Sequence, residues 1–365
     1  MSHDIARFNA EMKFGVRGKF RAVVHKGHKY DEDGNIIEFG EVIRETPFGK
    51  NIITNYGFDW WLGGTPSGGG AAIHMIAGPS NVAPVESDTA MGDAFGRATT
   101  FVSTVQTAQN TDPTAGPLFA TVQHRRTFNP GDLGASAVNV AKAGLIGSGI
   151  GSPNLAQIRA APLYCAGLLV DSGGVPTTIS VQPTEYLDLI WEYTEFFPHG
   201  VTGSFTLTVD GSPTSVNYTV RCMGLIERSD SRYAFWGALA TTINSVAPQF
   251  LQRSSVDING TYNPTVLGYN ASGLSLPSTI PNPPANGSTL APNSTVAAAY
   301  VPGSKERSHT CTWALARGNA SPNCNVLRLK FNSCSAFQIL FSPGIAKNNT
   351  RQLELTFKMS MANVP

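Results

Sequence analysis

The residues with the clearest chemical potential include two histidines that lie close together, in the run His25-Lys26-Gly27-His28. Imidazoles are common ligands of transition metals, so this spacing raises the question of a metal site. The run follows a segment with strand periodicity, and histidines at the solvated end of a strand are usually surface residues. We therefore predict two exposed histidines and no metal site.

A second group consists of four carboxylates within one predicted strand region, Glu185, Asp188, Glu192 and Glu195. General acid–base catalysis by paired carboxylates needs both groups on one side of the bond that is broken. Side chains alternate across a strand, so Glu185 and Asp188 face opposite sides. We predict that these acids are solvated charges at a sheet edge, which oppose aggregation.

No other segment supplies a catalytic or cofactor-binding pattern. The chain contains neither a Gly-x-Ser-x-Gly elbow nor a His-Glu-x-x-His motif. Residues 63–72 are rich in glycine, but no Lys-Ser/Thr pair follows, as a phosphate-binding loop requires. We therefore predict a protein that is not an enzyme, without catalytic, cofactor-binding or metal-binding residues.

Cysteines and tryptophans leave alternatives open. The five cysteines, Cys165, Cys222, Cys311, Cys324 and Cys334, form no Cys-x-x-Cys pair. They fit buried thiols, and the alternative is a disulfide that forms after release from the cell. The tryptophans could line a sugar-binding groove, but several lie in apolar runs, which favours core packing. These are Trp60, Trp61, Trp191, Trp236 and Trp313.

The elements that must carry these residues are mostly strands. Apolar residues at every second position from Phe14 to Val24 indicate a half-buried strand. Residues 163–195 and 203–225 predict further hairpins, and residues 310–361 predict four closing strands separated by turns, one of them at 342–347. Short helices are expected within residues 50–61 and at 155–160.

Composition favours the same fold class. Glycine (37 residues) and proline (24) are frequent, and only 14% of the residues are charged. We predict an all-β fold, mainly antiparallel and sandwich-like, with long loops and few short helices. The expected segments are an N-terminal attachment hairpin (1–62), a central sandwich-like domain (63–225), an extended Asn/Pro/Ser/Gly-rich arm (226–310) and C-terminal strands that complete a β domain (311–365).

The charge pattern limits the partners. The formal net charge is +1, and no run of Lys or Arg stands out, so the footprint of a nucleic-acid-binding protein is missing. No signal peptide is visible, and no apolar run is long enough for a transmembrane helix. Neutral polar surface is less costly to desolvate than charged surface, which suits burial against other protein chains.

Several spaced patches resemble a group of structural proteins of tailed bacteriophages, namely tail, baseplate and tail-fibre components. They begin with the element Lys50-Asn51-Ile52-Ile53-Thr54 and continue in the same order along the chain. The patches are residues 48–59, 73–79, 83–91, 126–131, 140–145, 163–171, 174–181, 185–192 and 337–347. The chain departs from the pattern at Lys142, where the group has an acidic residue, and residues 226–310 match no part of it.

The resemblance implies a structural component of a virion, in the tail, baseplate, neck (collar) or fibre apparatus. Such a chain is made in the bacterial cytoplasm. Its expected partners are copies of itself, in a ring or trimer, and other virion proteins. The alternative is a receptor-binding module of a tail fibre that binds host-surface glycans. The resemblance carries over no catalytic residue.

Overall fold

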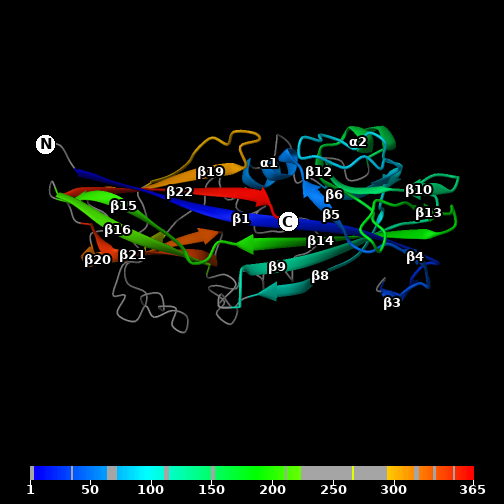
Figure 1. The fold of residues 1–365 in the computed structure, drawn as a ribbon, viewed down its shortest axis with the longest axis horizontal. Helices are drawn as coiled ribbons and strands as arrows, with labels where there is room; N and C mark the ends of the chain where they lie inside the picture. Colours follow the sequence, from blue (N-terminus) through cyan, green and yellow to red (C-terminus); the bar gives the residue numbers. More distant parts are fainter. Residues whose placement is uncertain are drawn as a thin grey trace.

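The structure, a computed structural model, describes residues 4–33, 36–63, 72–110, 115–148, 153–209, 212–222, 265–266, 294–315, 320–331, 334–347 and 350–365. Strands hold 59% of the residues and helices 5%, which confirms the all-β class. The molecule is elongated (Figure 1). Among the described residues, no helix is long and apolar enough to cross a bilayer.

The described elements are, in chain order, β1 (Asp4–His25), β2 (Lys29–Tyr30), β3 (Ile36–Glu38), β4 (Val42–Glu45), β5 (Gly49–Ile53), α1 (Asn55–Gly63), β6 (Ala72–Gly78), β7 (Gly96–Arg97), β8 (Thr100–Asn110), β9 (Leu118–Phe128), β10 (Val138–Val140), β11 (Lys142–Ser148), α2 (Leu155–Ala160), β12 (Leu163–Leu168), β13 (Ile179–Val181), β14 (Tyr186–Phe197), β15 (Val201–Val209), β16 (Ser212–Cys222), β17 (Thr265–Val266), β18 (Ser294–Ala297), β19 (Glu306–Trp313), β20 (Ala320–Phe331), β21 (Cys334–Lys347) and β22 (Arg351–Asn363).

The long strand β1 connects the two ends of the molecule (Figure 1). Its second half pairs antiparallel with β14, and β14 continues the sheet to β9 and β8. Along the other edge of β1, β22 pairs in parallel with the first half, and β5 and β4 pair with the second half. A single 13-stranded sheet therefore contains strands from all four segments expected from the sequence, including β18 from residues 226–310.

The core lies on one face of β1. Met12, Phe14, Val16, Phe20 and Val24 are all buried, which confirms the alternation read from the sequence. The five-stranded sheet β15-β16-β21-β20-β17 covers the first half of β1 and contributes residues such as Val216 and Phe341 to the same cluster. Around the second half, β5, β12, β11 and β6 supply residues to that cluster, which runs through both ends of the molecule.

The short helices occur where the sequence predicts them. In α2, the side chain of Asn154 accepts the N–H of Gln157 at 2.9 Å, and the Gln157 side chain accepts the N–H of Asn154 at 2.9 Å. This capping box satisfies two donors that a helix start otherwise leaves unpaired. Thr54 caps α1 in a similar way, accepting the N–H of Gly57 at 3.1 Å.

One predicted turn is wrong. Residues 342–347 contain a Ser-Pro-Gly sequence that indicates a turn, yet they continue β21 as far as Lys347. Pairing with β20 explains the difference, since Ile345 lies opposite Cys324 and Lys347 lies opposite Ala320. Pairing with a neighbouring strand therefore overrides the local turn signal.

Two ionisable groups lie in the apolar core as neutral species. Burial raises the pKa of Glu195 to about 8, although a hydrogen bond from the Tyr193 hydroxyl, 3.0 Å long, works against the shift. Burial and then the nearby charge of Arg126 lower the pKa of His124 to about 3. The His124 ring stacks on Trp191 with ring centroids 5.4 Å apart. The core therefore tolerates these groups because both are uncharged at neutral pH.

We expect Glu195→Gln to change how stability depends on pH. Because the folded pKa is raised, the folded state holds a proton that the unfolded chain releases above about pH 4.5. The wild-type free energy of unfolding should therefore lose a contribution between pH 5 and 8, by up to about 1.4 kcal/mol per pH unit. The variant lacks this loss and should be the more stable protein at pH 8. Urea denaturation at several pH values measures the difference.

The control is Glu192→Gln, which changes an acid on the opposite face of the same strand. This variant keeps Glu195, so its free energy of unfolding should still fall between pH 5 and 8 as in the wild type. Parallel profiles for the wild type and Glu195→Gln from pH 5 to 8 would contradict a buried protonated carboxyl.

Candidate functional site

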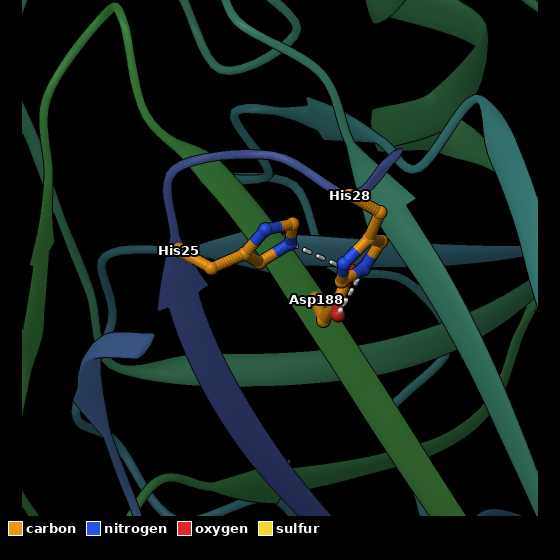
Figure 2. Close-up of side chains that lie close together, drawn as sticks. All are labelled: His25, His28 and Asp188. Carbon is orange, nitrogen blue, oxygen red and sulfur yellow. Dashed lines mark hydrogen bonds and ion pairs between the residues drawn. The ribbon is translucent and has the colours of Figure 1, made fainter. Parts of the chain in front are cut away.

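A cluster of polar side chains lies on the sheet face opposite the core, where β1, β14 and β9 run side by side (Figure 2). Asp188 projects from β14, and Arg125 and Thr127 project from β9. His25 is the last residue of β1, and His28 lies in the loop that follows. Register explains the meeting, because Asp188 pairs with Val23 of β1 on one side and with Thr127 on the other.

The Asp188 carboxylate is fully buried and receives contacts from four side chains. Its Oδ2 lies 3.1 Å from Nε2 of His28, 2.6 Å from Nε of Arg125 and 2.5 Å from the Arg125 Nη2. Its Oδ1 accepts a hydrogen bond from the Thr127 hydroxyl and lies 3.2 Å from Nε2 of His25. The His25 contact is close but is not aligned as a hydrogen bond.

Backbone donors determine which nitrogen of each histidine carries the proton. The N–H of Gly27 donates to Nδ1 of His25 at 3.0 Å, and the N–H of Gly40 donates to Nδ1 of His28 at 2.9 Å. A ring nitrogen that accepts a hydrogen bond carries no proton. We infer that each neutral ring is protonated at Nε2, the nitrogen that faces Asp188. The two rings stack with centroids 4.0 Å apart and planes 15° from parallel.

These contacts keep Asp188 ionised. Burial on its own would raise its pKa, but the Nε2–H groups of His25 and His28, the charge of Arg125 and the Thr127 hydroxyl outweigh it. The pKa of Asp188 therefore lies well below its usual range. A buried charge of this kind is stable only with such partners, because desolvation of an unpaired ion is costly.

The same contacts disfavour a metal ion. One ligand atom from each of His25, His28 and Asp188 lies within 4.8 Å of the others, which is close enough for a shared cation. A histidine that ligates through Nε2 needs a lone pair there, and its Nδ1–H normally donates to an acceptor. Here each Nδ1 accepts a backbone N–H instead, and the Arg125 guanidinium already binds the Asp188 carboxylate that a metal ion would need. We conclude that the cluster has a structural role. We call its five residues, His25, His28, Arg125, Thr127 and Asp188, the Asp188 clasp.

The clasp holds a projecting segment, residues 29–33 and 36–43, which we call the apolar hairpin. Phe39 packs edge-on against the His28 ring, with centroids 5.3 Å apart, and under the Arg125 guanidinium at 4.8 Å. The outer side chains of the hairpin are 37% to 68% exposed; they are Tyr30, Ile37, Phe39, Val42 and Ile43. Two ion pairs flank them, Lys26–Glu41 at 2.8 Å and Lys29–Glu38 at 2.5 Å.

The predicted exposure of the two histidines, of Asp188 and of Glu195 is wrong, and Glu195 is 2% exposed on the core face of β14. The side chains of His25 and His28 are each 1% exposed, because the chain turns back after β1 against β14. Asp188 is buried because β14 lies between β1 and β9 and is not an edge strand. The sequence offered one signal, an acid inside the apolar run Leu187-Asp188-Leu189-Ile190.

The other candidate residues have separate environments. Glu185 pairs with Arg44, and Glu192 pairs with Lys19 at 3.5 Å. Trp191 and Trp313 are buried, which confirms core packing for these two. Cys165 and Cys311 are buried. Outside the described side chains lie Trp60, Trp61, Trp236, Cys222, Cys324, Cys334 and most of the glycine-rich segment 63–72.

Comparison of the chain with protein-family models, with curated proteins and with solved structures gave no match in any of the three. The geometry described above and the sequence patches are therefore the basis for a functional inference.

We expect Asp188→Asn to destabilise the fold by about 3 kcal/mol or more, because it leaves the Arg125 cation in a largely buried position without its partner. Urea denaturation at pH 7 measures the change. Glu185→Gln is the control, since the Arg44 side chain of its ion pair is 37% exposed and stays partly hydrated without its partner, so the loss should be about 1 kcal/mol or less. Equal losses in the two variants would contradict the clasp.

The same denaturation curves also test the metal argument. Zn²⁺ in modest excess should leave the wild-type midpoint unchanged, because both Nε2 atoms carry protons. A stabilisation by Zn²⁺ that disappears in His28→Gln would show that the two histidines are ligands after all.

Proposed function

We propose that the chain is a structural component of a tailed-bacteriophage virion, in the tail, baseplate, neck (collar) or fibre apparatus. In this proposal it acts by assembly, with copies of itself in a ring or trimer and with other virion proteins. The proposed location in a virion rests on the sequence patches that resemble tailed-phage structural proteins. The observation that supports assembly is the apolar hairpin.

Exposed apolar side chains that gather on one projection are a sign of a protein interface. Single exposed apolar residues are ordinary on soluble proteins, but contiguous patches usually mark interaction sites. Tyr30 and Ile37 lie on a ribbon, β2 and β3, whose paired strands have only two and three residues, and Phe39 follows it directly. Val42 and Ile43 lie beside them at the start of β4, which pairs with β1. A two-stranded ribbon of this size is marginal in water, so it needs support. The Asp188 clasp supports one side, and a partner that covers the other side would bury the apolar residues.

A second surface supports the same proposal. Strand β8 pairs with β9 alone among the described strands, so its other edge presents unpaired backbone groups within that set. Its eleven residues, TFVSTVQTAQN, include no charge and no proline. Natural proteins usually use charged residues or prolines to protect an exposed strand edge from pairing. An uncharged edge of this length is suited to pairing with a neighbouring chain.

One observation favours the alternative, a receptor-binding module for host-surface glycans. Tyr30 and Phe39 are aromatic and are 43% and 60% exposed. Aromatic faces can stack on sugar rings, since they are apolar and flat. The neighbouring Ile37, Val42 and Ile43 are aliphatic, however, and favour a protein surface, so we retain assembly as the main proposal.

We expect Ile37→Asp to weaken self-association at least tenfold, because it places a charge in the centre of the proposed contact. Ile37 is 68% exposed, so the fold should tolerate the change. Val82→Asp is the matched control, with the same 68% exposure on a different loop. Sedimentation velocity over a range of concentrations measures association, and a glycan array screened with both variants tests the alternative.

Three outcomes would contradict assembly through the apolar hairpin. They are a wild type that stays monomeric at every concentration, association that Ile37→Asp leaves intact, and equal weakening by Val82→Asp. The position in the virion is tested separately by electron microscopy of particles labelled with an antibody against this chain. The proposal requires label at the neck, tail, baseplate or fibres.

A further inference from the structure

Three side chains that the assembly proposal does not use meet beside helix α1. The Glu86 carboxylate contacts both of the others: the Lys305 ammonium binds its Oε2, and Nδ2 of Asn363 donates to its Oε1 at 2.8 Å. An amine, a carboxamide and a carboxylate between them are the groups needed for an amide exchange. The Glu86 side chain is 40% exposed and the Lys305 side chain 24%.

The backbone at Lys305 is unusual. It has a φ of 54°, the only positive φ at a non-glycine residue in the described part of the chain. Left-handed conformations are unfavourable for residues with a Cβ and persist where surrounding contacts require them. Here the Lys305 carbonyl accepts the N–H of Met361 at 2.9 Å, and its ammonium lies 5.0 Å from the centre of the Phe58 ring. The strained backbone thus places the amine beside Glu86.

Asn363 is held equally firmly. Its Oδ1 accepts the N–H of Ile53 at 3.1 Å, and its Nδ2 donates to the Ile53 carbonyl at 3.0 Å as well as to Glu86. A backbone N–H on the amide oxygen polarises the carbonyl. It would also stabilise negative charge on that oxygen during attack at Cγ.

We propose that Lys305 and Asn363 form an intramolecular isopeptide bond, with Glu86 as the group that transfers the proton. Glu86 removes a proton from the Lys305 ammonium, and the neutral Nζ attacks Cγ of Asn363. The Ile53 N–H stabilises the oxyanion on Oδ1. Nδ2 takes the proton from Glu86, the Cγ–Nδ2 bond breaks, and ammonia leaves. Glu86 then takes the second proton from Nζ and passes it to the ammonia, which departs as ammonium. One ammonium and one carboxamide give one secondary amide and one ammonium ion, and the step needs no oxidant.

Electrostatics predicts a slow reaction that is faster in alkali. The hydrogen bond from Lys305 lowers the pKa of Glu86, although partial burial works against this shift. The carboxylate is therefore ionised and can accept a proton, but it is a weak base. Attack requires the neutral amine, whose fraction increases with pH. Attack also breaks the cation–π contact between the Lys305 ammonium and the Phe58 ring, which slows the reaction further.

The bond would fasten the C-terminal part of the fold. Lys305 immediately precedes β19, and Asn363 is the last residue of β22, its partner strand. The cross-link would close a loop that contains β20 and β21, and would also hold β22 at its junction with β5. Such a closure restricts the unfolded chain, as a disulfide does.

Intact-mass spectrometry of the denatured full-length chain tests the proposal. After incubation at pH 8 to 9, the wild type should become lighter by the mass of one ammonia, faster at the higher pH. A protease digest should contain a joined pair of peptides from the regions of Lys305 and Asn363. Lys305→Arg and Glu86→Gln should slow the loss at least tenfold, while Lys358→Arg should not change it. Lys358 is the control because it also pairs with acids, Glu306 and Glu11.

Two results would overturn the proposal. A wild-type mass that stays equal to the sequence mass would show that the three groups form only an ionic contact. An ammonia loss that persists in Lys305→Arg would show cyclisation of an asparagine with its own backbone. Circular dichroism of each variant verifies that the fold is retained, so that a lost cross-link is not a lost fold.

Discussion

The arrangement at one end of the molecule depends on a single buried charge, the Asp188 carboxylate. An isolated carboxylate at this position would be unstable, so each of its contacts is needed. The contacts come from β9, from the end of β1 and from the loop after it, and they fix these three segments relative to β14. The histidine rings add two backbone hydrogen bonds through Nδ1, which hold Gly27 and Gly40 in place. The conformation of the apolar hairpin follows from this chain of contacts.

The rest of the fold follows from β1. Because this strand pairs along both edges, the sheets at the two ends of the molecule share one core. The core even includes His124 and Glu195, which are neutral there. The apolar hairpin exposes five large apolar side chains among charged residues, and the β8 edge is uncharged. Apolar side chains and an uncharged strand edge lose little on desolvation, which agrees with the proposal of a protein that works by contact with other chains.

The sequence was sufficient to predict elements whose pattern lies within a few consecutive residues. Alternation predicted β1 from Phe14 to Val24, and the residues of α2 were predicted with the limits that the structure shows. It was insufficient where distant strands meet. Asp188 was assigned to a sheet edge because nothing local shows that β14 lies between β1 and β9. The contact of Glu86 with Lys305 and Asn363 is likewise invisible until three distant segments are placed. Even the turn signal at 342–347 was overridden by pairing with β20.

Hydrogen–deuterium exchange of the monomeric and the assembled protein tests the central claim most directly. In the monomer, the amides of Gly27 and Gly40 should exchange slowly, because they donate to the buried histidine rings, while the outer amides of the apolar hairpin exchange fast. On assembly, the hairpin amides should become protected. Fast exchange at Gly27 and Gly40 would contradict the clasp, and hairpin exchange that is identical in the two states would contradict assembly through this surface.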